Sequence, residues 1–209
     1  MKKNIFITGI GTNVGKTIVS SILVESLEAD YWKPIQAGDL HNSDSMKVQR
    51  LITNTKSKFH TESYKLQEAA SPHYAAELEN VQIEIDKIKR PKTNNNLIIE
   101  GAGGLLVPIN STNFISDLIQ PHDYVILVSK HELGSINHTL LSLQYLKKVD
   151  CKKVGLIFIG DENNATEKII LHFSKIEFHI GIPLIKSFSK DTIKIISNNI
   201  SNKLQEFLK

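Results

Sequence analysis

A glycine-bearing stretch near the start of the chain has the residue types that bind phosphate. Residues 9–17 run Gly-Ile-Gly-Thr-Asn-Val-Gly-Lys-Thr. In such a loop the backbone N–H groups point inward at an anion, and the dipole of a helix that starts there favours negative charge. The lysine at its end reaches the outer phosphates of a nucleotide, and the threonine hydroxyl binds Mg²⁺. The stretch predicts a nucleotide site formed by Asn13, Val14, Gly15, Lys16 and Thr17.

The match to the general phosphate-loop pattern G-x-x-x-x-G-K-[ST] is imperfect. The pattern requires glycine at position 10, where this chain has Ile10 between two glycines. The alternative is a tight turn between a strand and a helix, in which Lys16 is merely solvated. A strand-like run at residues 4–8 and a helix-like run at 18–27 enclose the loop, and this context favours phosphate binding.

A second lysine lies where the next strand is expected to end. Lys33 follows the strand-like residues 31–32, and Pro34 biases it toward extended geometry. In open α/β sheets the carboxyl ends of parallel strands face the ligand crevice. Lys33 is therefore a candidate ligand-binding residue, with an ordinary surface lysine as the alternative.

Two carboxylates are candidate metal ligands. Asp44 lies in the sequence Asn-Ser-Asp-Ser at residues 42–45, where it either helps to cap a helix expected over 46–53 or binds Mg²⁺. Glu100 ends an apolar strand at 97–99 and precedes four small residues. A carboxylate at the tip of a strand beside a phosphate loop is placed to bind a nucleotide-bound Mg²⁺.

Apolar runs and helical periodicity alternate along the rest of the chain. Further strands are expected over residues 124–128, 153–159 and 178–183, and further helices over 113–119, 133–148, 162–174 and 191–208. Residues 56–96 have no clear pattern, and 81–88 fit either a helix or a strand. Fully apolar strands that alternate with helices predict an α/β fold with three layers, a mostly parallel sheet flanked by helices as in P-loop NTPases. We expect one domain over residues 1–209.

Composition excludes several classes of protein. The 209 residues are 41% hydrophobic and 22% charged, with a formal net charge of +3. That charge is slight and the lysines are scattered, so no nucleic-acid surface is indicated. The sequence indicates no signal peptide, and no apolar run approaches the about 20 residues of a membrane span. The single cysteine, Cys151, cannot form an internal disulfide, which favours a reducing, cytoplasmic location.

Seven short blocks extend the pattern over nearly the whole chain. They have the sequences GTNVGKT, KPIQAG, NSD, SPH, EGAGG, GSINH and GIP, at residues 11–17, 33–38, 42–44, 71–73, 100–104, 134–138 and 181–183. In these blocks and in their order the chain resembles the dethiobiotin synthetase family. Members of that family are ATP-dependent carboxylases that close a ureido ring.

The resemblance implies an ATP-dependent ligase acting on 7,8-diaminopelargonic acid and CO₂. One amine takes up CO₂ to give a carbamate, the γ-phosphoryl group of ATP moves to the carbamate oxygen, and the second amine closes the ring. Lys16 is expected to stabilise charge on the γ-phosphate and the carbamate, and Lys33 to bind the carbamate or the diamine. The implied Mg²⁺ ligands are Thr17, Asp44 and Glu100, which favours the metal-binding role of Asp44 over capping.

The resemblance also implies a homodimer with the active site at the subunit interface. Thr12 and Ala37 would contact the substrate. The distal carboxylate of the substrate would bind backbone N–H groups at a helix N-terminus of the partner subunit, contributed by Gly134, Ser135, Ile136 and Asn137. The nucleotide base would lie near the backbone of Gly181, Ile182 and Pro183.

Three positions depart from the family pattern. Residues 10–11 are Ile-Gly where the family usually has Thr-Asp or similar, and Ala37 replaces a common serine. Ile159 stands where an asparagine often reads adenine. We therefore expect weaker discrimination between ATP and GTP than a side-chain amide would provide.

Two other classes share parts of the pattern. Partitioning-type ATPases carry an extra lysine five residues before the loop lysine, and this chain has Gly11 at that position. A nucleotide kinase or a related amide-forming ligase would use the same loop; a kinase would not need CO₂, and glutamine-dependent amide synthases need an additional glutaminase domain.

Overall fold

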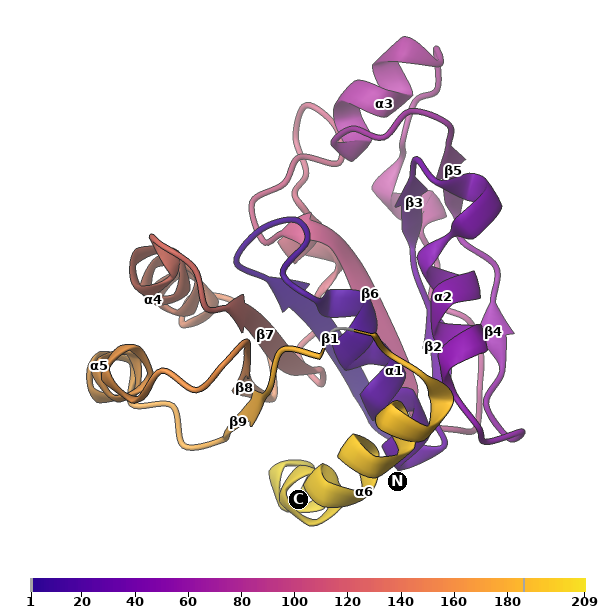
Figure 1. Ribbon diagram of the computed structural model, residues 1–209. Helices are drawn as coiled ribbons and strands as arrows, with labels where there is room; N and C mark the ends of the chain where they lie inside the picture. Colours follow the sequence, from indigo (N-terminus) through magenta and orange to yellow (C-terminus); the bar gives the residue numbers. More distant parts are fainter. Residues whose placement is uncertain (1, 186) are drawn as a thin grey trace.

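The chain folds around a seven-stranded sheet in which every neighbouring pair of strands is parallel (Figure 1). The computed structural model describes residues 2–185 and 187–209. The strand order is β4-β2-β6-β1-β7-β8-β9. The strands are β1 Asn4–Gly9, β2 Asp30–Trp32, β4 Phe59–His60, β6 Leu97–Gly104, β7 Tyr124–Lys130, β8 Lys153–Ile159 and β9 His179–Ile182.

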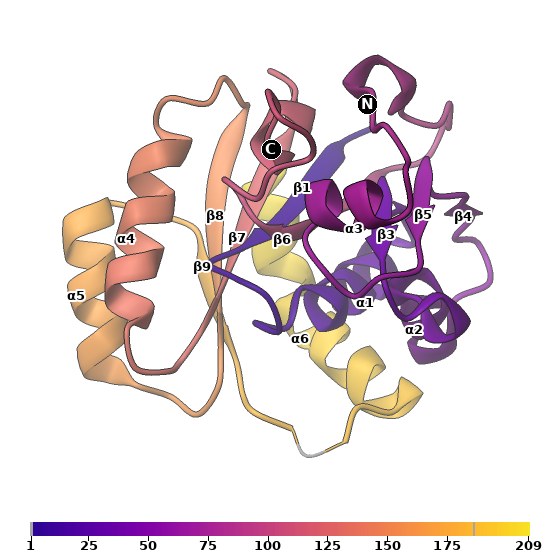
Figure 2. The same cartoon turned by 90° about the horizontal axis from the view of Figure 1, so that it is seen from above.

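Helices cover both faces of this sheet, which confirms the expected three-layer fold (Figures 1 and 2). One face packs against α1 Lys16–Leu27, α2 Asp44–Leu51 and α6 Lys190–Phe207. The other packs against α3 Pro72–Leu78, α4 Ser135–Leu146 and α5 Asn164–Ser174. Because successive side chains of a strand point to opposite faces, Ile5 and Ile7 of β1 enter the first core and Phe6 enters the second.

A small second sheet stands beside the main one. It pairs β3 Ile35–Ala37 with β5 Tyr64–Leu66 in parallel, and α3 packs against it. The expected end of a strand before Pro34 is confirmed, but the chain resumes extended geometry directly after it. Short 3₁₀ helices form parts of the connections, η1 Leu40–Asn42, η2 Ile85–Lys87 and η3 Ile115–Leu118.

Several expected boundaries differ from the structure. The helix expected over 46–53 begins at Asp44, because the Ser43 side chain caps it by accepting a hydrogen bond from the backbone N–H of Met46. The helix expected over 113–119 is only the 3₁₀ turn η3, and residues 81–88 form neither a long helix nor a strand.

The strand that holds Glu100 is also longer than expected. It continues through Gly104, and its register against β1 shifts after the pair Ile7–Glu100, with the next pair at Gly9–Gly104. Glu100 is thus the last residue of regular pairing, directly before an irregular glycine-rich segment. Among the described residues, no helix is both long and apolar enough to cross a membrane.

Candidate active site

The phosphate-loop sequence forms the turn between β1 and α1. Gly15 caps α1 in a left-handed conformation, with φ of 96°, so the helix starts at Lys16. A Cβ atom on Gly9 would lie 2.6 Å from a methyl group of Val14, which is buried and packs over that glycine. The ammonium of Lys16 donates a hydrogen bond to the carbonyl oxygen of Gly11, 2.8 Å away. The loop therefore curls around the lysine.

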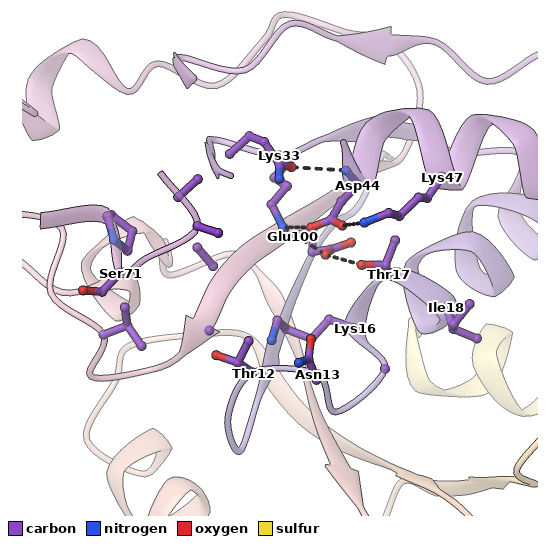
Figure 3. A pocket seen from close by; sticks show the side chains of 18 of the residues that line it. Thr12, Asn13, Lys16, Thr17, Ile18, Lys33, Asp44, Lys47, Ser71 and Glu100 are labelled. Atoms are coloured by element: carbon purple, nitrogen blue, oxygen red, sulfur yellow. Dashed lines mark hydrogen bonds and ion pairs between the residues drawn. The ribbon is translucent and has the colours of Figure 1, made fainter. Parts of the chain in front are cut away.

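A pocket of about 1020 Å³ lies along this loop. Figure 3 shows charged side chains at its centre, with Ser71 at one end and Ile18 at the other. The wall toward Ser71 carries small apolar side chains, Ala37, Ala69, Ala70, Ala102 and Val107. This volume is at the upper end of the range for small-molecule sites.

Glu100 is the buried centre of the pocket floor. Its carboxylate accepts four hydrogen bonds and its side chain is 1% exposed. Oε1 receives the Thr17 hydroxyl at 3.0 Å and the Lys33 ammonium at 3.2 Å. Oε2 receives the hydroxyls of Ser20 at 2.7 Å and Tyr31 at 3.0 Å. Burial, together with the charge of Glu100, raises the pKa of Tyr31 well above its ordinary value, so this hydroxyl stays a donor.

Lys33 bridges the two candidate metal ligands. Its ammonium forms ion pairs with Asp44 Oδ2 and with Glu100 Oε1, and its side chain is almost fully buried. Burial lowers the pKa of Lys33, but the charges of Glu100 and Asp44 outweigh burial and the pKa is raised overall. Burial likewise raises the pKa of Asp44, and the charge of Lys33 outweighs it, so the pKa of that carboxyl is lowered. Lys33 and Asp44 are both charged at neutral pH.

For Lys16, burial outweighs the effect of the neighbouring carboxylates on the pKa. Burial lowers its pKa to about 8, with Lys33 adding to the effect and Glu100 and Asp44 opposing it. An anion bound beside Lys16 would stabilise the charged form and reverse this shift. Lys16 is therefore placed to bind a negatively charged ligand.

The expected Mg²⁺ ligands come together in space. Thr17 donates to the Glu100 carboxylate, and one ammonium contacts both Asp44 and Glu100, so the three oxygen-bearing side chains converge. Mg²⁺ prefers oxygen ligands and is usually bound through one or two carboxylates plus substrate phosphates. Within the described part of the chain, no group of three or more His, Cys, Asp or Glu residues is placed to hold a metal ion. The donor set fits a Mg²⁺ ion that arrives with a nucleotide.

The remaining predicted residues divide into two groups. One group lines the pocket together with Lys16 and Thr17, namely Thr12, Asn13, Gly15 and Ala37. Val14 is buried and packs beneath the loop, against Gly9. Two predicted segments do not line it. Residues 134–137 lie at the N-terminal end of α4, with Ser135 buried and Ile136 and Asn137 exposed, and residues 181–183 lie at the end of β9.

Several residues of the site were not predicted from the sequence. Ser20 lies three positions after Thr17, hence on the same face of α1, and this spacing was a usable signal. Tyr31 and Phe188 had none, because Tyr31 meets Glu100, and Phe188 reaches the pocket, only through the packing of separate elements. Lys47, on α2, pairs with Asp39 at 2.7 Å and with Asp44 at 3.3 Å.

The chain is similar to known proteins over nearly its whole length. A family model described as an AAA domain matches residues 3–192. A protein of Christiangramia forsetii, named ATP-dependent dethiobiotin synthetase BioD, is 55% identical over 206 residues, which cover 99% of this chain and 100% of that relative. The chain belongs to the dethiobiotin synthetase family. Proteins of the same name from Cytophaga hutchinsonii and Brucella ovis are 50% and 38% identical, over 86% and 92% of this chain and 88% and 92% of theirs.

Solved structures with the same fold are more distant from this dethiobiotin synthetase family member. A ParA family ATPase from Chlorobium tepidum has a TM-score of 0.56 at 12% identity, covering 94% of this chain and 98% of its own. The cell division ATPase MinD of Pyrococcus furiosus has a TM-score of 0.57 at 13% identity, covering 97% and 99%. These similarities show the P-loop ATPase fold alone.

Proposed function

We propose that this chain is an ATP-dependent dethiobiotin synthetase, which carboxylates 7,8-diaminopelargonic acid with CO₂ and closes the ring at the expense of ATP. The observation that carries the proposal is the convergence of Lys16, Lys33, Asp44 and Glu100 on one pocket, in a chain with full-length relatives of that name. ATP with Mg²⁺ and the diamine would occupy the two ends of this pocket.

The reaction needs three bond-forming steps. One amine nitrogen attacks CO₂ and loses a proton, which gives a carbamate. A carbamate oxygen then attacks the γ-phosphorus, and the bond to ADP breaks to leave a carbamic-phosphoric mixed anhydride. The second amine attacks the carbonyl carbon, the carbon–oxygen bond to phosphate breaks, and dethiobiotin, ADP and phosphate result.

The two lysines would supply charge where it develops. Phosphoryl transfer depends mainly on positioning and on neutralising negative charge. Lys16 would bridge the γ-phosphate and the carbamate, and Lys33 would bind the carbamate. Thr17, Asp44 and Glu100 would hold Mg²⁺, which supplies further neutralisation of the phosphates when bound. Thr12 would hydrogen-bond the substrate.

The pocket would also favour the reactive form of the diamine. An ammonium group cannot attack CO₂ or a carbonyl carbon, so each amine must lose its proton. Neighbouring positive charges and burial both disfavour an ammonium ion. Lys33 and Lys47 are paired with carboxylates, whereas Lys16 donates to the carbonyl oxygen of Gly11 and would act in this sense. The wall of small apolar residues that includes Ala37 would then take the aliphatic chain of the substrate.

We further propose a cytoplasmic homodimer. In that assembly the backbone N–H groups at residues 134–137 of the partner subunit would bind the distal carboxylate of the substrate. Sedimentation equilibrium tests this directly, because a dimer has twice the 23.5 kDa mass of the chain. A monomer under assay conditions would contradict the shared site.

Phosphate release from MgATP, measured with and without the diamine and bicarbonate, tests the activity. Release that needs both substrates, with dethiobiotin identified by mass spectrometry, supports the proposal. Lys33→Met should abolish release, whereas Lys87→Met is a matched control, because that lysine is exposed and pairs with Glu84 on the surface. ATP hydrolysis that ignores the diamine would contradict the proposal and favour a switch ATPase.

A further inference from the structure

Apolar side chains line the end of the pocket opposite Ser71. It consists of Ile18 on α1, Leu51 on α2 and Phe188, which directly precedes the N-cap of α6. All three side chains are half-buried, and all three pack on the core between α1 and α6. Figure 3 shows Ile18 at this end of the pocket, beyond Thr17 and in front of the α6 ribbon.

The direction of a bound nucleotide follows from the charges. The reacting γ-phosphate must lie near Lys16, Lys33 and the two carboxylates, at the centre of the pocket. The remaining phosphates bind the N–H groups at the start of α1, since that is where the helix dipole and the unpaired donors are. The ribose and the base then extend past Thr17, toward Ile18 and away from Ser71.

The described residues at this end provide few unpaired polar groups that could hydrogen-bond to the edge of a base. Lys47 is paired with Asp39 and Asp44, and Arg50 donates to the side chain of Asn42. Ile159, at the position where the family often has an asparagine, is 5% exposed and packs against Gly15, where an added Cβ would lie 3.4 Å from its side chain. An aromatic ring, in contrast, can stack on the face of any base.

We propose that Phe188 is the platform on which the nucleotide base stacks, with Ile18 and Leu51 enclosing it. The site holds the base by its face, so it accepts purine nucleotides of either kind with similar affinity. This inference rests on the proposed use of ATP by the pocket, and it adds the residue that binds the base and the selectivity that results.

Equilibrium binding measured by calorimetry separates the contribution of the base to affinity from that of the phosphates. The ligands are MgATP, MgGTP and magnesium tripolyphosphate, and the proteins are the wild type, Phe188→Leu and Phe188→Trp. Leucine keeps most of the apolar bulk that packs on the core, and tryptophan keeps an aromatic face. Phe173→Leu is the matched control, because Phe173 lies on α5 and is 61% exposed. Thermal unfolding of each variant verifies its fold.

We expect Phe188→Leu to weaken the binding of MgATP and of MgGTP by the same factor, about five-fold or more, because a base–aromatic stack is lost. Tripolyphosphate binding should be unchanged, and Phe188→Trp should restore nucleotide affinity. Unchanged MgATP binding in Phe188→Leu, or equal weakening of ATP and tripolyphosphate, would overturn this inference alone. A wild type that binds neither ATP nor tripolyphosphate would overturn the proposed use of ATP together with it.

Discussion

Replacing Glu100 by glutamine tests the hydrogen-bond network at the pocket floor. The carboxylate is 1% exposed and accepts hydrogen bonds from three hydroxyls and one ammonium. The substitution Glu100→Gln keeps the size and shape of the side chain. It removes the negative charge and turns one of the two acceptor oxygens into an NH₂ donor.

The magnitude follows from which atom faces which partner. The amide oxygen must face Lys33, because an ammonium only donates. The NH₂ group then faces Ser20 and Tyr31, whose hydroxyls must turn from donating to accepting. Hydrogen bonds to a charged group contribute about 1.5–3 kcal/mol and neutral ones about 0.5–1.5 kcal/mol. About 1 kcal/mol is therefore lost for each of the four bonds, and relief of repulsion from Asp44 reduces this to a total of about 2–4 kcal/mol.

Urea and thermal unfolding of the free protein measure the effect. A loss of this size lowers Tm by about 5–15 °C in a chain of this length. Glu84→Gln is the matched control, because Glu84 pairs with Lys87 on the surface and its side chain is 46% exposed; we expect a change within about 0.5 kcal/mol. Equal or greater stability of Glu100→Gln would refute the reasoning, since repulsion between Asp44 and Glu100 would then exceed the hydrogen bonds.

Three further predictions concern pH and selectivity. Because burial holds the pKa of Lys16 at about 8 in the folded chain against 10.5 ordinarily, Lys16→Met should be more stable than the wild type at pH 7, by about 3 kcal/mol. The wild type should recover as pH rises from 8 to 10.5. Asp30→Asn should be less stable by about 2–4 kcal/mol at pH 7, because the buried Asp30 carboxylate accepts hydrogen bonds from four donors. Burial raises the pKa of Asp30, but its hydrogen bonds outweigh burial and the pKa is lowered overall. The difference should therefore begin to shrink below about pH 4 and be lost only as pH falls through the lowered pKa of the folded state. GTP and CTP should support turnover within about ten-fold of ATP, roughly 1.4 kcal/mol of discrimination, and Ile159→Asn should unfold the protein more readily instead of restoring selectivity.

Chemical denaturation across pH examines the first two predictions. A stability difference for Lys16→Met that stays constant from pH 7 to 10 would contradict the depressed pKa of Lys16. A difference for Asp30→Asn that does not shrink between about pH 6 and about pH 2 would contradict the second prediction. Initial rates with the three nucleotides examine the last prediction. A strong preference for ATP would show that the base edge is read elsewhere, and full stability of Ile159→Asn would contradict the packing of that side chain against Gly15.

The sequence was sufficient for the strands of the main sheet other than β4, and for the charged centre of the site. Fully apolar runs predict buried parallel strands, and parallel strands bring their carboxyl ends to one edge. Lys16, Lys33 and Glu100 each follow or end such a run, so their proximity could be expected before any contact was known. The ambiguity at Asp44 came from local signals, because the same residue starts a helix and faces the pocket.

Only the tertiary structure decided the surroundings of these residues. Strands of two or three residues, such as β3, β4 and β5, carry no periodicity, and their pairing joins segments far apart in the chain. Tyr31 reaches Glu100 across neighbouring strands, and Phe188, near the other end of the chain, lines the same pocket as Thr17. A side chain's type and spacing determine which strand or helix it favours, whereas the residues it meets depend on how those elements pack together.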